Sequence, residues 1–205
     1  MKKVVLLGDS IRLLGYGNTV AQALSDEFEV WQPKENCKYA KYTLRAIYDW
    51  RENIEGADII HWNNGIWDLC RPFDGEPFTP VDQYVEEMVR VAKQLKKYAK
   101  VVIFATTTPT RPANTNFIRP GDAEFYNAAL PENANFIRPG DAELYNAALL
   151  PRLQEMGIVI NDLYSVVAQD PHRYICEDLT HLSEDGITAC AAQVEKHIRT
   201  QAELL

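Results

Sequence analysis

The chain has 205 residues, of which 46% are hydrophobic, and a formal net charge of −8 at neutral pH. This length and apolar content suit one globular domain with its own core. The negative charge argues against nucleic-acid and anionic-membrane partners, because both demand a basic protein surface. No apolar run approaches the roughly 18 residues of a membrane span. The run at residues 4–7 is too short for a secretory leader, so we expect a cytoplasmic location.

The first half of the chain alternates strand and helix patterns. Residues 4–7 form a continuous apolar run, which is typical of a strand buried on both faces, and helical spacing follows over residues 20–28. Residues 30–31 suit a short second strand. Residues 42–54 have a helical period, and residues 57–62 are predicted to form a third strand.

The second half continues this alternation. Residues 81–98 have the clearest helical pattern, with apolar residues at helical spacing and charges between them. Strands are predicted at residues 101–105 and 158–160, and a closing helix at residues 184–204. Strands that alternate with helices indicate a parallel sheet. The predicted fold is therefore a three-layer α/β/α, flavodoxin-like domain over residues 1–205, with five parallel strands and helices on both faces.

A tandem repeat follows the fourth predicted strand. Residues 112–130 and 131–149 are copies that differ only at Ala113/Glu132, Thr115/Ala134 and Phe125/Leu144. We interpret them as a duplication, because stacked repeat arrays need about three units or more. The second copy runs into the fifth strand, so we expect it to supply the fourth helix.

The first copy is then an insertion between strand four and helix four. Both copies contain a possible helix start, at Gly121-Asp122 and at Gly140-Asp141, so they could also compete for one position. Insertions in surface loops cost little free energy, so a tolerated loop is favoured over a lid or an oligomer contact.

Two short motifs carry the side chains of nucleophilic acyl transfer. Residues 8–10 read Gly-Asp-Ser directly after the first strand, and residues 178–181 read Asp-Leu-Thr-His. A serine hydroxyl needs an imidazole to take its proton, and a carboxylate to orient that imidazole. Ser10 is therefore the predicted nucleophile, His181 the base and Asp178 the orienting carboxylate. Ligands of such sheets bind at the carboxyl ends of the strands, where Ser10 is expected.

With these motifs the chain resembles the SGNH, or GDSL, hydrolase superfamily. The resemblance is carried by residues 8–10, by the Gly-Ile-Trp-Asp block at residues 65–68, and by Asp-x-x-His at residues 178–181. It covers nearly all of the chain apart from the duplicated segment. It implies an α/β/α esterase, lipase, thioesterase or carbohydrate deacetylase that uses no metal and no other cofactor.

The resemblance also implies an oxyanion hole with three donors, which stabilise the charge of the tetrahedral intermediate. The backbone N–H of Ser10 is the first. Tryptophan stands where the family has its asparagine, so Asn63 or Asn64 is expected to supply the amide. Asn63 is preferred, because the block is similar to a sub-family that reads Asn-x-Gly-Leu-His-Asp. The second block lacks its glycine, and the backbone N–H of Lys41 is the nearest match.

Other polar and aromatic residues receive structural interpretations. Arg12 is expected to be solvated or ion-paired, although it could bind a substrate carboxylate. His61 is expected to be packed and hydrogen-bonded in its strand. His172 and Cys176 lie near the Asp-x-x-His motif, but the spacing is not a zinc pattern, so no metal site is predicted. Three tryptophans are interpreted as core residues, with a sugar or acyl pocket as the alternative: Trp31, Trp62 and Trp67.

The sequence thus predicts a serine esterase that cleaves a small-molecule carboxylic ester through an acyl-enzyme on Ser10. Short-chain acyl esters, including acetyl groups on carbohydrate, are favoured because no long apolar segment is available for lipid. An acyltransferase with the same triad stays open, as does a non-catalytic carbohydrate- or nucleotide-binding protein. A phosphate-binding loop would be rich in Gly, Ser and Thr, whereas residues 11–14 are mostly apolar. The oligomeric state is left open.

Overall fold

The computed structural model describes residues 1–71, 74–111 and 137–205. Its sheet has five strands in the order β2-β1-β3-β4-β5, and every pairing is parallel. In chain order the strands are β1 (Lys2–Gly8), β2 (Phe28–Trp31), β3 (Ala57–Asn63), β4 (Ala99–Ala105) and β5 (Val159–Asn161). The parallel five-stranded sheet predicted from the sequence is confirmed.

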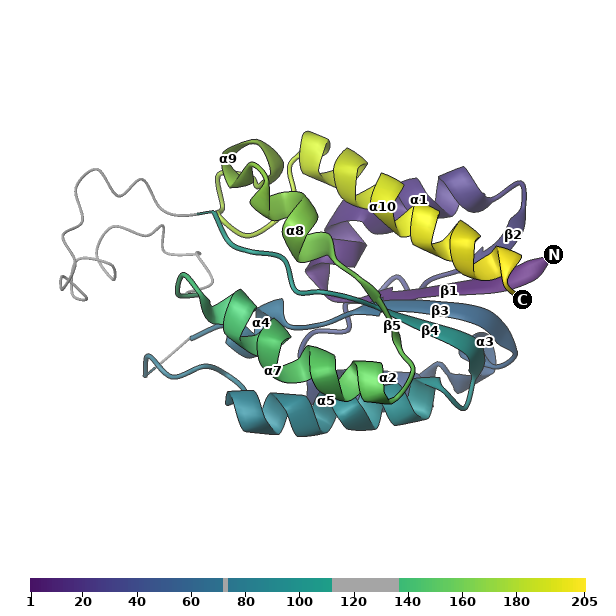
Figure 1. The fold of residues 1–205 in the computed structure, drawn as a ribbon, viewed down its shortest axis with the longest axis horizontal. Coiled ribbons are helices and arrows are strands. Elements are labelled where there is room, and N and C mark those ends of the chain that lie inside the picture. The colour runs from purple at the N-terminus through teal and green to yellow at the C-terminus, as the bar shows by residue number, and fades with distance from the viewer. Residues whose placement is uncertain (72–73, 112–136) are drawn as a thin grey trace.

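Helices cover both faces of this sheet, as Figure 1 shows. One layer consists of η1 (Ile11–Tyr16), α1 (Gly17–Leu24), α8 (Leu163–Ala168), α9 (Pro171–Tyr174) and α10 (Glu184–Glu203). The other consists of α2 (Ala40–Asp49), α3 (Arg51–Ile54), α4 (Ile66–Leu69), α5 (Val81–Leu95) and α7 (Asp141–Glu155). The predicted three-layer architecture is therefore confirmed. Among the described residues, no helix has the length and apolarity needed to cross a bilayer.

The apolar runs of the sequence form the middle of the sheet. All four residues of the run at 4–7 are inaccessible to solvent, which explains why this strand shows no polar alternation. Trp62 of β3 is buried and packs on Phe104 of β4 with ring centroids 4.7 Å apart. Trp31 packs against Trp50 at 6.2 Å. Trp67 departs from its interpretation as a core residue, because it is exposed on α4.

Several helix boundaries differ from the sequence predictions. The helix expected over residues 20–28 instead occupies Ile11–Tyr16 and Gly17–Leu24, with a non-helical kink at Gly15. This stretch contains two glycines, which are poor helix formers, so its helical period is hard to recognise in the sequence. The short helices α8 and α9 were not predicted. Their signal is an aspartate cap: Asp162 accepts from Ser165 N–H and Asp170 from Arg173 N–H.

The second copy of the repeat contributes the start of α7. This helix begins at Asp141, directly after Gly140, whose φ of 90° is left-handed. Tyr145 of α7 donates a hydrogen bond to Thr79 O at 2.7 Å, and Arg71 pairs with Asp141. The first copy, with its expected helix start at Gly121-Asp122, lies outside the described residues. Its interpretation as an insertion stays a prediction.

Candidate active site

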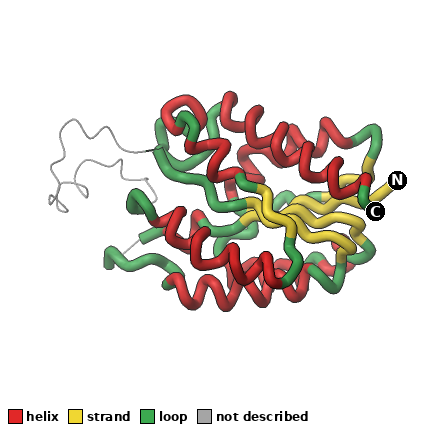
Figure 2. The backbone as a smooth tube through the Cα atoms, in the orientation of Figure 1, coloured by secondary structure: helices red, strands yellow, loops and turns green. Residues whose placement is uncertain are grey.

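Ser10 lies at the carboxyl edge of the sheet, in the turn between β1 and η1. Its side chain is almost buried, with 5% of the residue exposed, and its Oγ makes no hydrogen bond with any described residue. Asp9 Oδ1 accepts hydrogen bonds from Ile11 N–H at 2.9 Å and from Asn63 Nδ2 at 2.7 Å. The first bond closes the turn around Ser10, and the second joins the turn to the end of β3. Both chain termini lie at the opposite end of the sheet (Figure 2).

The close packing of this turn explains the glycine of the Gly-Asp-Ser motif. Gly8 is paired with Asn63 in the β1–β3 register, and the Asn63 side chain lies directly over it. A Cβ atom on Gly8 would stand only 2.0 Å from Asn63 Oδ1. Any larger residue at position 8 would therefore displace Asn63.

Asp178 and His181 form the second half of the predicted triad, in the loop between α9 and α10. Their side chains are hydrogen-bonded, with His181 Nδ1 2.7 Å from Asp178 Oδ2. Asp178 Oδ1 also accepts the backbone N–H groups of Thr180 and His181, each at 2.9 Å. Partial burial raises the pKa of Asp178, but these three hydrogen bonds outweigh it and hold the pKa below the usual value. The carboxylate therefore stays ionised at neutral pH and orients the imidazole.

The loop that carries His181 packs against the segment that follows Ser10. Leu182 Cδ1 would stand 3.2 Å from a Cβ on Gly15, and α10 contacts η1. Burial raises the pKa of Asp9 to about 6, and an imidazolium at His181 would oppose that shift, so His181 lies in the neighbourhood of the serine turn. No hydrogen bond joins Ser10 to His181 in the described part of the chain. Catalytic hydrogen bonds are often long before substrate binds, so their contact in the triad stays a prediction.

Asn64, one candidate for the oxyanion hole, is fully buried and has other partners. Its Nδ2 donates to Lys38 O at 2.8 Å, and its Oδ1 accepts from Thr43 Oγ1 at 2.9 Å and Trp62 Nε1 at 3.0 Å. These bonds join the loop before α2 to the end of β3. Asn64 thus has a clear structural role that the sequence did not reveal.

The loop before α2 contains a left-handed residue, Lys38, that the comparison of sequence motifs did not identify. Lys38 has a φ of 51°, which is the left-handed conformation that glycine adopts most readily. The Lys38 N–H donates to Asn36 Oδ1 at 2.7 Å. Asn36, two residues earlier, is therefore the residue from which this turn could have been predicted. Lys41 lies three residues further on, in the first turn of α2, with Nζ 3.9 Å from Glu87. Its backbone N–H stays a predicted oxyanion donor.

Arg12 is neither solvated nor paired with a carboxylate, contrary to expectation. It is buried, and its guanidinium donates to Pro33 O at 2.9 Å and Glu35 O at 2.7 Å. These bonds fasten the loop after β2 to η1, so Arg12 is a structural residue. The interpretation of His61 is confirmed, since it is buried with Nε2 3.0 Å from the Asn161 amide.

Asp68 of the Gly-Ile-Trp-Asp block caps α2 from a distance. Its two carboxylate oxygens lie 3.2 and 3.1 Å from Ala40 N, at the first turn of that helix, which has no capping side chain of its own. Burial raises the pKa of Asp68 to about 7, against the hydrogen bonds from Thr79 and Ala40. Asp68 therefore positions the loop before α2 and is not available for chemistry on the substrate.

The raised pKa of Asp68 predicts a loss of stability as the pH rises from about 4 to about 7. An unfolded aspartate releases its proton near pH 4, whereas Asp68 in the folded chain keeps its proton to about pH 7. The folded state thus binds more protons in this window, and the free energy of unfolding falls with pH. An asparagine at this position has no proton to lose, so Asp68→Asn should reduce the fall measured by urea unfolding at about pH 5 and about pH 8. The same fall in both proteins would exclude Asp68 as its source.

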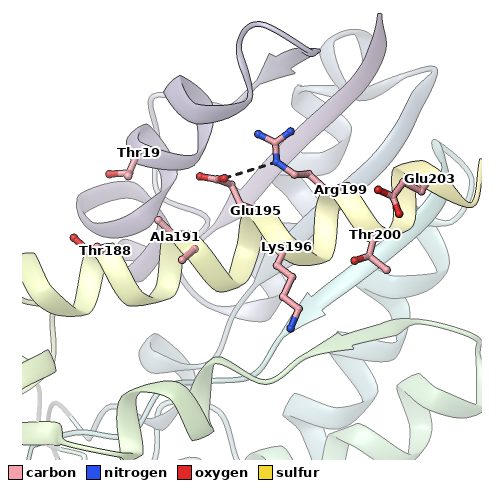
Figure 3. A pocket seen from close by; sticks show the side chains of 9 residues that line it. Thr19, Thr188, Ala191, Glu195, Lys196, Arg199, Thr200 and Glu203 are labelled. Carbon is pink, nitrogen blue, oxygen red and sulfur yellow. Dashed lines mark ion pairs between the residues drawn. The ribbon is translucent and has the colours of Figure 1, made fainter.

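A separate groove of about 540 Å³ lies between α1 and α10 (Figure 3). Its lining includes Thr19, Thr188 and the ion-paired Glu195 and Arg199, whose charged groups are 3.8 Å apart. None of the predicted site residues lines it. This groove is therefore not the candidate active site.

No family model matches the chain, and no curated protein sequence matches it. Several solved structures, in contrast, have a similar fold. A lipase/acylhydrolase from Enterococcus faecalis has a TM-score of 0.73 at 16% identity, over 98% of this chain and 97% of that one. The acetyl xylan esterase AlAXEase has a TM-score of 0.70 at 16% identity, over 96% and 99%. An acetylxylan esterase from Geobacillus stearothermophilus has a TM-score of 0.67 at 16% identity, over 96% and 94%.

The chain has the SGNH hydrolase fold. In this SGNH fold the Gly-Asp-Ser turn follows β1, and the Asp-x-x-His loop precedes α10. Both motifs therefore occupy the places in the fold that the sequence resemblance implied.

Proposed function

We propose that the chain is a serine esterase in which Ser10 attacks the ester carbonyl. The observation that supports this most directly is the hydrogen-bonded Asp178–His181 pair, on a loop packed against the segment after Ser10. The solved structures with the same fold are described as acylhydrolases and acetylxylan esterases, which also supports ester hydrolysis. A triad requires the Asp-His half to be formed in advance, because the carboxylate fixes the imidazole tautomer.

In the proposed reaction, His181 Nε2 takes the Ser10 Oγ proton as Oγ bonds to the carbonyl carbon. The tetrahedral intermediate collapses when the imidazolium protonates the departing alcohol, which leaves the acyl group on Ser10. His181 then deprotonates a water molecule that attacks the acyl carbon, and the carboxylic acid leaves as Ser10 regains its proton. The backbone N–H of Ser10 and the backbone N–H of Lys41, in the first turn of α2, are the proposed oxyanion donors.

A fluorophosphonate probe tests this proposal. We expect the probe to label the wild-type chain covalently and to leave Ser10→Ala unlabelled, because only an activated serine attacks phosphorus at a useful rate. Ser25→Ala is the matched control, since Ser25 is an exposed serine beyond α1. Labelling that persists in Ser10→Ala, or a folded wild-type chain that does not react, would refute the esterase proposal.

For the substrate, we propose short-chain esters of carbohydrate. Three aromatic side chains form a partly exposed cluster before and within α2 and before α5: the ring of Tyr39 is 4.9 Å from Phe78 and 6.1 Å from Tyr42. Phe78 is 48% exposed although it is a large apolar residue. Exposed rings of this kind offer a flat apolar surface to the C–H face of a sugar.

The loop that leads into the aromatic cluster is hydrogen-bonded to the strand end before the serine turn. Cys37 N–H donates to Gly8 O at 3.0 Å, and Gly8 N–H donates to Cys37 Sγ at 3.3 Å. Tyr39 follows Cys37 by two residues, and Ser10 follows Gly8 by two residues. The Cys37–Gly8 hydrogen bonds therefore join the segment of the cluster to the segment of the nucleophile. The alcohol part of an ester bound at Ser10 would therefore be within reach of the cluster.

Replacing Phe78 by alanine is expected to raise the KM for an acetylated xylo-oligosaccharide about 3- to 10-fold, since an aromatic contact contributes about 0.5–1.5 kcal/mol. The KM for ethyl acetate should stay unchanged, because it has the same acyl part and its small aliphatic alcohol cannot stack on the rings. Leu144→Ala, which truncates another exposed apolar residue on α7, is the control. Equal effects on both substrates would show that the cluster does not bind the sugar.

A further inference from the structure

We propose that Asn63 is a positioning residue that holds Ser10 through Asp9, and that it is not the oxyanion donor expected from the sequence. This inference rests on the proposed esterase function. It deepens that function by assigning a task to the buried network beneath the nucleophile.

Both ends of the Asn63 side chain are engaged inside the protein. Nδ2 donates to Asp9 Oδ1 at 2.7 Å, and Oδ1 accepts from Tyr16 OH at 2.8 Å. Only 4% of the residue is exposed, and it lies against Gly8, where there is no room for another side chain. The orientation of the amide is therefore fixed toward Asp9.

Asp9 depends on Asn63 for its hydrogen bonding. Asp9 is completely buried, its Oδ2 has no partner among the described residues, and its Oδ1 is shared between Asn63 and Ile11 N–H. Arg12 makes no hydrogen bond to Asp9, because its guanidinium NH groups donate to Pro33 O, Glu35 O, Gln32 Oε1 and Gly8 O, and its buried Nε has no partner in the part of the chain that the structure describes. Loss of the Asn63 amide would leave a buried carboxylate with a single donor, which is costly.

Ser10 is the residue enclosed by these bonds. Asp9 precedes it, Ile11 follows it, and the Ile11 N–H to Asp9 bond spans it. If the carboxylate of Asp9 turns away, the backbone of the turn moves and the Oγ atom moves with it. A displacement of about 1 Å at a nucleophile can lower the rate about 100-fold.

The two possible roles of Asn63 can be separated by a double-mutant cycle with Asp9. If Asn63 acts only through Asp9, Asn63→Ala should cost no further activity once Asp9 has been replaced by alanine. If the Asn63 amide itself binds the oxyanion, the same substitution should lower kcat by a similar factor whether or not Asp9 is present.

We expect Asn63→Ala to lower kcat for p-nitrophenyl acetate about 100-fold in the wild-type background, and to change it by no more than about twofold in the Asp9→Ala background. Hydrogen exchange of the Ile11 amide is measured in parallel, and should be fast in Asn63→Ala and in both proteins that lack the Asp9 carboxylate. A further loss of about 100-fold when Asn63→Ala is added to Asp9→Ala would overturn the proposal, because the Asn63 amide itself would then be needed.

The remaining outcomes are also decisive. An Asn63→Ala variant with wild-type kcat and a protected Ile11 amide would overturn the proposal, since the serine turn would then not need the Asn63 amide. Wild-type turnover that does not depend on Ser10 would overturn the esterase function itself. The Ile11 exchange data separate these two failures, because they report on the turn whether or not an ester is cleaved.

Discussion

Replacing His181 by alanine is expected to lower kcat for p-nitrophenyl acetate about 10⁴-fold, with little change in melting temperature. The imidazole is the only group in the proposed mechanism that removes the serine proton and then returns it to the alcohol. Its hydrogen bond to Asp178 lies in a partly exposed loop, so its loss should cost little stability. Steady-state kinetics and a thermal melt of the same preparation measure the two effects.

Two further variants sharpen this result. Asp178→Asn keeps the shape of the side chain but cannot stabilise the imidazolium, and we expect a loss of similar order. Glu177→Gln is the matched control, because Glu177 is adjacent but points outward to Arg111 at 2.9 Å. It should retain wild-type turnover. His181→Ala turnover above about a tenth of wild type would remove His181 from the mechanism.

Replacing Arg71 by methionine is expected to destabilise the fold by about 3–5 kcal/mol, because it breaks a buried ion pair and leaves one charge unpaired. The side chains of Arg71 and Asp141 are only 8% and 10% exposed, and both carboxylate oxygens of Asp141 accept from the guanidinium. After the substitution, Asp141 keeps only the Arg138 N–H at 2.9 Å. Urea unfolding measures the change in the free energy of unfolding.

Arg45→Met is the control for this prediction. Arg45 pairs with Asp49 at 2.8 Å on the surface of α2, where solvent screens the ion pair and it adds little stability. The double variant Arg71→Met with Asp141→Leu should recover much of the loss, because no charge is then buried alone. An Arg71→Met variant as stable as Arg45→Met would show that the buried pair does not stabilise α7.

The strands were predictable because their buried residues are adjacent in the sequence and apolar. Residues 4–7 of β1 and residues 101–105 of β4 form uninterrupted apolar runs, and only a strand covered on both faces makes such a run favourable. The helices α5 and α10 were predictable from their periods. Short helices such as α8 carry too few residues for a period, so their only signal is the capping aspartate.

The candidate site was predictable only in part. Chemistry selected Ser10, Asp178 and His181 from residue types and spacing alone. The environment of the serine was not accessible in this way, because Asp9 and Asn63 are 54 residues apart and meet only through the β1–β3 register. The left-handed backbone of Lys38 could not be predicted for a related reason: one long-range hydrogen bond, from Asn64 Nδ2 to Lys38 O, stabilises a conformation that lysine rarely adopts.

The anchoring of α7 has a consequence for how the duplicated sequence can vary. Asp141, Tyr145 and Asn146 bind Arg71, Thr79 and Thr107, and each of these three partners occurs only once in the chain. The repeated sequence offers the same anchors again as Asp122, Tyr126 and Asn127. Arg71, Thr79 and Thr107 can bind the side chains of only one copy at a time. The equivalent side chains of the other copy are therefore not needed for these contacts. Mutational tolerance is therefore expected to be unequal between two segments that are almost identical in sequence.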